Sequence, residues 1–283
     1  MKRYIYKQLL AWKNEKEHKP LILNGARQVG KTYILREFGR NEYKRMAFFS
    51  LDRDQKALEI FNKGGRATDM LMALSAICHE DITPHDTLVV LDEIQNCPKA
   101  LEALKFFCEE TPEIDIVVAG SLLGLSIHSG VSYPVGKVEE LHLYPMTFLE
   151  FLEAMGKTQL VNLLENKNWT VINMLETELI SSLRQYYYVG GMPAAVLAHI
   201  EKKGWKEVRR IQQQIITDYR RDFSKHAPTR EIPRINMVWD SIPAQLAKEN
   251  KKFVYGAVKK SARAADFEMA IQWLIDAGLA YKV

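Results

Sequence analysis

The sequence has few cysteines and no long apolar run, and these absences exclude several classes of protein. Its three cysteines, Cys78, Cys97 and Cys108, form no C-x-x-C pair, so we expect reduced thiols in a cytoplasmic protein and no disulfide scaffold. No stretch approaches the roughly 18 apolar residues of a membrane span. The first 19 residues also lack the apolar core and cleavage site of a signal peptide. We therefore expect no membrane association.

The chain also has little net charge, +4 in 283 residues, but its charges are unevenly distributed. Residues 1–200 carry 22 Lys and Arg against 25 Asp and Glu, whereas residues 201–283 carry 17 against 10. A basic C-terminal part favours an acidic partner such as DNA. Solvated helix faces are the alternative explanation of these cations, and a protein partner or a second copy of the chain is the alternative partner.

Short apolar runs alternate with helical patterns in the first half of the chain. Runs that are continuously apolar are typical of strands buried on both faces, and helices between them indicate a parallel sheet of the α/β class. The five predicted strands lie at Leu21–Leu23, Met46–Phe49, Thr87–Leu91, Ile114–Ala119 and Glu140–Tyr144.

The second half is predicted to be almost entirely helical, because its apolar residues recur with a 3.6-residue period. We expect helices at Val171–Tyr187, Lys206–Phe223, Ile235–Lys248 and Arg263–Ala277. The run of residues 190–193 (GGMP) is expected to end the first of these helices, and the proline-containing segment 226–233 to be a linker. The change of pattern near residue 150 and the linker divide the chain into an α/β core at 1–150, a helical region at 151–228 and a third segment at 229–283.

A phosphate-binding loop (P-loop) is the clearest motif, because residues 25–32 match G-x-x-x-x-G-K-[ST] at every fixed position. Its glycines let backbone N–H groups turn toward phosphate oxygens at the start of a helix. Lys31 is expected to reach the β- and γ-phosphates and Thr32 to ligate Mg²⁺. A glycine-rich turn before a helix is the alternative. The predicted nucleotide-binding residues are Gly25, Ala26, Arg27, Gln28, Val29, Gly30, Lys31 and Thr32.

Two acids follow the third apolar run, at the carboxyl end of a predicted strand, where ligand groups lie in open α/β sheets. We expect Asp92 to hold Mg²⁺ and Glu93 to accept a proton from the attacking water or to orient it. Ser121 ends the next strand and is a candidate contact of the γ-phosphate or the lytic water. The alternatives are an Asp that caps a turn and a Ser that caps a helix near Leu122.

Five motifs in this order resemble the AAA+ ATPases of bacteria and archaea that join an AAA domain to a C-terminal region of unknown function. The motifs are GARQVGKT, LDEIQNCP, AGSLLGL, YPVGKVEELHLYPMTFLEFL and YYYVGGMPAAV, and the resemblance covers nearly the whole chain. It implies a five-stranded P-loop core, a helical lid and a winged-helix-like C-terminal segment. It also implies that Gly25 to Thr32 form the Walker A motif, that Asp92 and Glu93 form Walker B, and that Ser121 is the sensor-1 residue.

The resemblance implies roles for two further residues. Lys137 stands where the family has an arginine that can act in trans on a neighbouring subunit. The lysine keeps the positive charge of that arginine but lacks its planar guanidinium group. Pro193 resembles a proline that packs on the adenine in signalling ATPases, and a proline at the first turn of a helix is the alternative. Members of the family run to about 400 residues or more, so we expect that this chain, which ends at residues 279–283 on the apparent start of a strand, is incomplete.

Within the C-terminal segment, a short helix at Val254–Lys259 and the helix at Arg263–Ala277 resemble the helix-turn-helix core of a winged helix. The three tyrosines at 186–188 are interpreted as packing residues at a helix end, with a base-stacking platform as the alternative.

The function expected from these features is Mg²⁺-dependent ATP binding and hydrolysis that regulates the binding of a partner or of nucleic acid. A nucleotide-gated switch with negligible turnover and a DNA-acting motor or loader are the alternatives.

Overall fold

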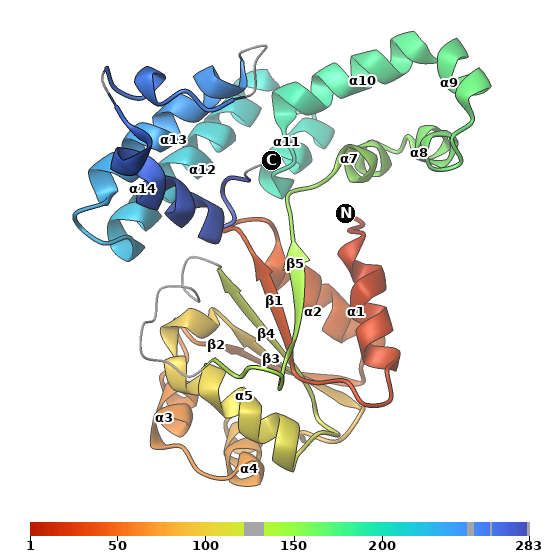
Figure 1. Cartoon of the computed structure of the whole chain (residues 1–283). Helices are drawn as coiled ribbons and strands as arrows, with labels where there is room; N and C mark the ends of the chain where they lie inside the picture. Colours follow the sequence, from red (N-terminus) through yellow and green to blue (C-terminus); the bar gives the residue numbers. More distant parts are fainter. Residues whose placement is uncertain (122–132, 248–251, 261, 282–283) are drawn as a thin grey trace.

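A sheet of five parallel strands forms the centre of the N-terminal half in the computed structural model, which describes residues 1–121, 133–247, 252–260 and 262–281. Across the sheet the strands are β2 (Arg45–Ser50), β3 (Thr87–Asp92), β4 (Asp115–Ser121), β1 (Leu21–Gly25) and β5 (Glu139–Leu143). Every neighbouring pair is parallel. This confirms the predicted α/β class (Figure 1).

Helices cover both faces of this sheet, as the continuous apolar runs predict. Successive strand residues enter opposite cores: Ile22 and Val118 belong to one apolar cluster, and Leu21 and Val117 belong to the other. The first face is covered by α3 (Gln55–Lys63), α4 (Ala67–Cys78) and α5 (Pro98–Glu110), and the second by α1 (Ile5–Asn14) and α2 (Lys31–Glu42).

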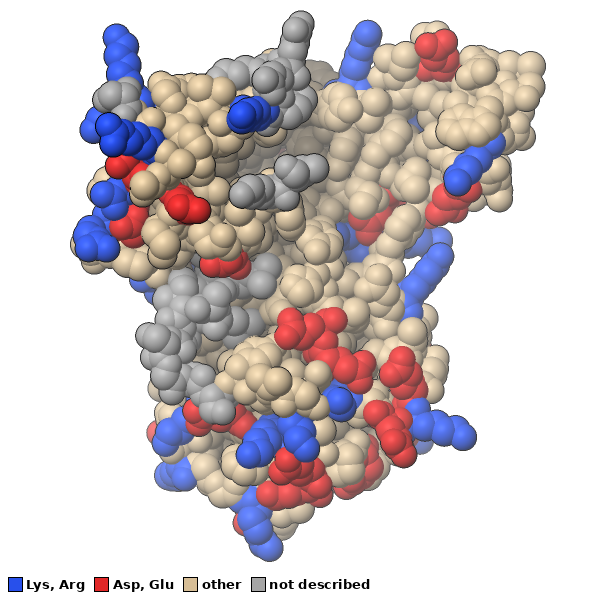
Figure 2. All heavy atoms as spheres, in the orientation of Figure 1, with Lys and Arg blue, Asp and Glu red and all other residues tan. Residues whose placement is uncertain are grey.

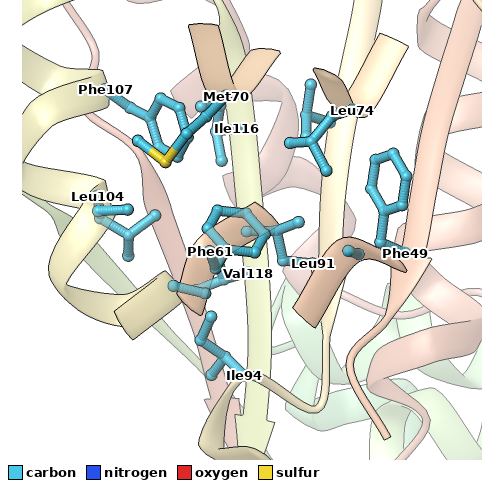
Figure 3. Packing of buried hydrophobic residues seen from close by; sticks show 14 of the residues in the cluster. Phe49, Phe61, Met70, Leu74, Leu91, Ile94, Leu104, Phe107, Ile116 and Val118 are labelled. Carbon is cyan, nitrogen blue, oxygen red and sulfur yellow. The ribbon is translucent and has the colours of Figure 1, made fainter. Parts of the chain in front are cut away.

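The cluster under α3, α4 and α5 is dense in large side chains (Figure 3). Phe61 and Phe107 meet edge to face with ring centroids 6.4 Å apart, and both are almost fully buried. Burial of one such side chain stabilises the fold by about 1.5–3 kcal/mol. Ile94, which directly follows the Asp92-Glu93 pair, is fully buried in the same cluster and so anchors the segment beyond β3.

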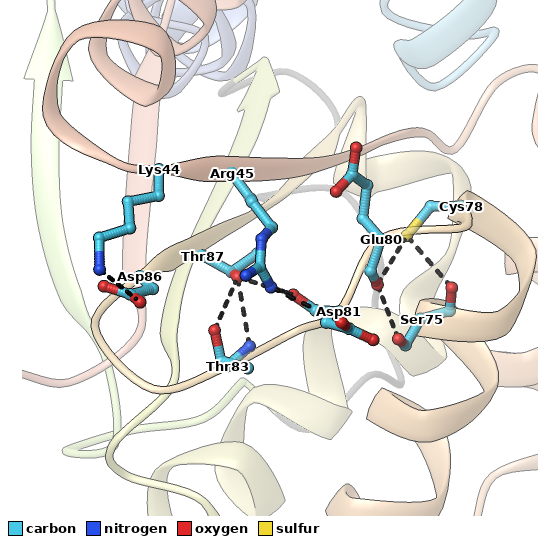
Figure 4. A network of polar contacts seen from close by, with 9 residues as sticks. All are labelled: Lys44, Arg45, Ser75, Cys78, Glu80, Asp81, Thr83, Asp86 and Thr87. Atoms are coloured by element: carbon cyan, nitrogen blue, oxygen red, sulfur yellow. Dashed lines mark hydrogen bonds and ion pairs between the residues drawn. The ribbon is translucent and has the colours of Figure 1, made fainter.

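Polar contacts hold the starts of β2 and β3, at the end of the sheet opposite the carboxyl ends of the strands (Figure 4). Lys44 Nζ lies 2.9 Å from Asp86 Oδ2, and Thr87 Oγ1 donates to the carbonyl of Asp81 at 2.9 Å. Arg45 donates to the same carbonyl at 3.2 Å. The ion pairs here are exposed and contribute little to stability. These contacts lie at the starts of the two strands, away from the P-loop.

The second half of the chain is helical and lies over the carboxyl ends of the strands (Figure 1). Its first helices are α7 (Phe148–Ala154), α8 (Thr158–Glu165), α9 (Trp169–Met174), α10 (Glu176–Val189) and α11 (Pro193–Ile200). The prediction of one helix over Val171–Tyr187 was wrong, because the chain breaks at Leu175 between α9 and α10. The predicted break at residues 190–193 is confirmed, since α10 ends at Val189 and α11 begins at Pro193.

The last helices are α12 (Trp205–His226), α13 (Ile232–Leu246) and α14 (Ala264–Asp276). The predicted helix over 254–259 was wrong, because only a 3₁₀ turn, Tyr255–Ala257, forms there. The described residues of 229–281 contain no strand, so that part of the chain has the helices α13 and α14 but not the β-wing of a winged helix. Residues 282–283 lie outside the described residues. The long helix α12 contributes Val208 to a cluster with α7 and α11, and Phe223 to a cluster with α13 and α14.

No helix in the described ranges is both long and apolar enough to span a lipid bilayer.

Candidate nucleotide site

The P-loop connects β1 to α2 at the carboxyl edge of the sheet, as its sequence predicts. Two of its residues have left-handed backbone, Gln28 with φ 65° and Gly30 with φ 99°. Val29 is fully buried in the core beneath the loop and anchors it there. A Cβ atom at Gly25 would collide with the carbonyl oxygen of Leu143 on β5, so the glycine is needed for close backbone approach.

Lys31 begins α2 and folds back over the loop. Its Nζ donates hydrogen bonds to the carbonyls of Gly25 at 2.8 Å and Ala26 at 2.9 Å. Burial lowers the pKa of Lys31 to about 8, against the opposing effect of the nearby acids Glu93 and Asp92. Within the described residues no carboxylate lies within ion-pair distance of this ammonium, so an anion such as phosphate fits beside it.

Thr32 and Asp92 are brought together from α2 and the end of β3. Thr32 Oγ1 donates to Asp92 Oδ2 at 2.7 Å, and Asp92 is buried. Burial raises the pKa of Asp92, while the hydrogen bond from Thr32 acts in the other direction. Mg²⁺ is commonly bound by one or two side-chain oxygens together with phosphates and water, so this oxygen pair fits a Mg²⁺ ion beside the P-loop.

The candidate base Glu93 has a left-handed backbone, with φ 57°, which is unusual for a residue other than glycine and is often found at functional sites. Gln95 donates its side-chain N–H to Glu93 Oε2 and accepts a hydrogen bond from the backbone N–H of Ser121 at 3.4 Å. One amide therefore links the candidate base to the candidate sensor residue. Sequence reasoning missed Gln95, although it lies only two residues beyond Glu93. The proposed helix start near Leu122 lies outside the described residues.

Helix α12 contacts the P-loop directly, and sequence reasoning did not foresee this contact. Asp222 forms an ion pair with Arg27, and the hydroxyl of Tyr219 donates to the carbonyl of Arg27 at 2.6 Å. Gln28 Nε2 donates to Asp218 Oδ2 at 3.0 Å. Arg27, one of the predicted nucleotide-binding residues, thus pairs with a carboxylate of α12. Burial raises the pKa of Asp222, while Arg27 acts to lower it.

Two other residues lie against the P-loop. Arg3, from the segment before α1, donates to the carbonyl of Val29 at 2.9 Å and pairs with Glu150 at 3.1 Å. Pro193 is the first residue of α11, and its Cγ lies 3.7 Å from the position that a Cβ of Gly30 would occupy. The loop is therefore contacted by both the N-terminal segment and the helical region, while Arg27 and Gln28 remain exposed.

Lys137 lies away from these residues. It precedes β5, whose first residue Glu139 pairs with Leu21 at the start of β1, at the opposite edge of the sheet from the P-loop. Its Nζ lies 2.9 Å from Glu109 Oε1, and both side chains are partly exposed. Within one chain it does not reach the site.

Two family models match parts of the chain. Residues 17–152 match a family model described as an AAA domain, and residues 180–283 match one described as a domain of unknown function, DUF8612. No curated protein matches the chain in sequence.

Solved structures resemble the whole chain. The Walker-type ATPase PABY2304 of Pyrococcus abyssi is 15% identical, with a TM-score of 0.57, over 98% of this chain and 89% of that one. ORC2 of Aeropyrum pernix, in ADPNP and ADP complexes, is 13% identical with a TM-score of 0.46, over 97% and 84%. AMPPCP-bound DnaA of Aquifex aeolicus is 14% identical with a TM-score of 0.41, over 98% and 87%. The fold assignment rests on the first of these.

Proposed function

We propose that this chain, which carries an AAA domain of the P-loop ATPase class at residues 17–152, binds ATP with Mg²⁺ and hydrolyses it. The observation that carries the proposal is the 2.7 Å hydrogen bond between Thr32 Oγ1 and Asp92 Oδ2. It joins the first turn of α2 to the end of β3, beside a buried lysine. The combination provides one cation for phosphate oxygens and two oxygens for a metal ion.

The backbone N–H groups at the start of α2 and the Lys31 ammonium are the donors that would bind the triphosphate. Lys31 now donates to the carbonyls of Gly25 and Ala26, so it would exchange these partners for phosphate oxygens. Mg²⁺ held by Thr32 and Asp92 would neutralise charge on the β- and γ-phosphate oxygens. Pro193 lies beside Gly30 and is our candidate for the adenine contact.

In the proposed hydrolysis, Glu93 orients or deprotonates the attacking water, and Ser121 contacts the γ-phosphate. In the present arrangement Gln95 occupies one carboxylate oxygen of Glu93. Glu93 therefore has to exchange this partner for water before it can act as a base. Gln95 also accepts a hydrogen bond from the backbone N–H of Ser121. A γ-phosphate that takes over this N–H would free Gln95 on that side, and the hydrogen bond from Gln95 to Glu93 would weaken.

This hold on Glu93 favours a second candidate function, a nucleotide-gated switch with slow turnover. In either case the output is a change in the helical region, because Arg27 and Gln28 of the P-loop contact α12 directly. The free cysteines support a cytoplasmic location. The basic C-terminal part, over which Lys and Arg side chains are exposed among some Asp and Glu (Figure 2), supports an acidic partner such as DNA.

The test is ATP affinity with and without Mg²⁺ for the wild type, Thr32→Val and the control Thr158→Val, which changes an exposed threonine on α8. We expect Mg²⁺ to increase wild-type and Thr158→Val affinity at least tenfold. Thr32→Val should lose most of that increase, because one of the two metal-binding oxygens is gone. Absence of ATP binding, or affinity that is independent of Mg²⁺ in the wild type, would contradict the proposal.

A further inference from the structure

A groove on the helical region lies outside the nucleotide site. Its volume is about 820 Å³, and it is lined by Glu176, Thr177, Ile180, Ser181, Arg184, Gln185, Tyr188 and Trp205. Most of these residues belong to α10, and Trp205 begins α12. Figure 1 shows α9 and α10 projecting from the body of the molecule, so the groove is on an outer arm. A volume of this size is in the range of ligand sites.

The aromatic end of this groove is rigid and exposed. The indole of Trp205 stacks on His199 with ring centroids 4.9 Å apart, and Tyr188 meets it edge-on at 4.9 Å. His199 in turn stacks on the buried Phe151. Trp205 nevertheless remains 48% exposed and Tyr188 53% exposed. A fixed aromatic surface can bind a flat ring at small entropic cost.

The three tyrosines of the YYY motif therefore divide between two roles. Tyr186 packs as the sequence predicts, with its hydroxyl donating to the carbonyl of Met146 at 2.7 Å. Tyr187 is 73% exposed, and Tyr188 is 53% exposed although its ring contacts Trp205 edge-on. The packing interpretation is confirmed for Tyr186 and was wrong for Tyr187, and the exposed pair leaves the stacking alternative open.

Three cations lie on the two helices that carry the aromatic end, and one of them lines the groove. Arg184 lines the groove, Lys206 follows Trp205, and Arg209 lies one helical turn beyond it on α12. None of the three has a carboxylate within ion-pair distance among the residues that the structure describes. The neighbouring acid Glu207 is already paired with Arg210 at 2.7 Å. Glu176 lines the far end of the groove, twelve residues or about 18 Å along α10 from Tyr188.

We propose that this groove binds single-stranded nucleic acid, with bases stacked on Trp205 and Tyr188 and phosphates beside Arg184, Lys206 and Arg209. Stacking platforms flanked by cations are the chemistry of single-strand binding. Bases in a duplex are already stacked on each other and cannot use such a platform. The proposal goes beyond ATP hydrolysis and does not depend on it, because binding can be measured without nucleotide.

The experiment measures binding of a fluorescent oligothymidylate by anisotropy without ATP, for the wild type, Trp205→Ala and Arg184→Gln. The matched controls are Trp169→Ala, an exposed tryptophan on α9, and Lys105→Gln, an exposed lysine on α5. We expect Trp205→Ala to weaken binding about tenfold or more. Arg184→Gln should weaken binding and reduce the slope of log K against log salt by about 0.7. The controls should bind as the wild type does, and an oligouridylate arm tells DNA from RNA.

Arg184 is exposed, so Arg184→Gln keeps the test decisive if Trp205→Ala unfolds. No single-strand binding at low salt would overturn the proposal. So would equal weakening in the controls, tighter binding of a duplex of the same length, or competition by polyglutamate as effective as that by unlabelled oligonucleotide. The last result would mean that an acidic polypeptide occupies the groove.

Discussion

The hydroxyl of Tyr219 donates a hydrogen bond to the backbone carbonyl of Arg27 at 2.6 Å, which joins α12 to the P-loop across 192 positions of sequence. Beside it the ion pair of Arg27 and Asp222 joins the same two elements. The helical region thus contacts the backbone of the loop that we expect to hold phosphate, and nucleotide binding and the position of α12 should influence each other.

Replacement of Tyr219 by Phe tests this coupling. The change keeps the ring and removes the hydrogen bond, so we expect the free energy of unfolding to fall by about 1 kcal/mol and the affinity for ATP to change several-fold. Tyr187→Phe is the control, because that side chain is 73% exposed. Isothermal titration with ATP and thermal unfolding provide the two measurements. Equal ATP affinity in Tyr219→Phe and the wild type would show that this contact is only structural.

Gln95→Ala tests whether the hydrogen bond from Gln95 holds Glu93 back. Without the amide, Glu93 no longer has to exchange a partner before it meets water, so we expect kcat for ATP hydrolysis to rise about threefold or more while KM changes little. A fall in kcat would contradict an inhibitory hold and would mean that the amide positions the carboxylate. Gln8→Ala on the exposed face of α1 is the control. An unchanged kcat in steady-state kinetics would show that Gln95 does not affect hydrolysis.

Gly25→Ala tests the close approach of the P-loop to β5. Its Cβ would meet the carbonyl oxygen of Leu143, and because backbone has to move, we expect destabilisation of about 1–3 kcal/mol and weaker ATP binding. Gly256→Ala is the matched control, because a Cβ there meets nothing within 4 Å. Chemical denaturation of both variants measures the difference. Equal stability of the two would contradict the geometry described at Gly25.

ATP affinity should depend on pH through Lys31. Its pKa in the free protein is lowered to about 8 by burial, and a bound polyphosphate favours the charged form and raises that pKa. Affinity should therefore be highest below pH 8 and fall as pH rises above it, until the pKa of the complex is passed. Titrations from pH 6.5 to 9.5 measure this trend. Lys31→Arg, which stays charged over that range, should reduce the dependence, and a wild-type affinity that is flat across the range would contradict it.

The sequence predicts much of the fold because the evidence for it is local. Continuous apolar runs such as Val89 to Leu91 indicate strands buried on both faces, and in the structure these residues are buried. The contact of Thr32 with Asp92 also follows from the rule that parallel strands end at one edge of the sheet. The helix boundary at Leu175 was missed because nothing in the apolar period marks it.

Contacts that depend on tertiary packing could not be predicted. Tyr219 and Asp222 lie on a helix whose own pattern indicates only an amphipathic surface, and their approach to Arg27 depends on how the helical region is seated over the sheet. Gln95 is close in sequence to Glu93, but its bond to Ser121 requires the relative position of β3 and β4. The exposure of Tyr188 beside Trp205 likewise depends on the packing of α10 against α12.

The most direct test of the central claim is steady-state ATP hydrolysis with Mg²⁺ by the wild type and Glu93→Gln, with ATP binding measured in parallel on both. The account predicts that both proteins bind ATP with similar affinity. It also predicts that the wild type releases phosphate and that Glu93→Gln does so at least a hundredfold more slowly. Equal turnover by the two proteins, or failure of the wild type to bind ATP, would contradict it.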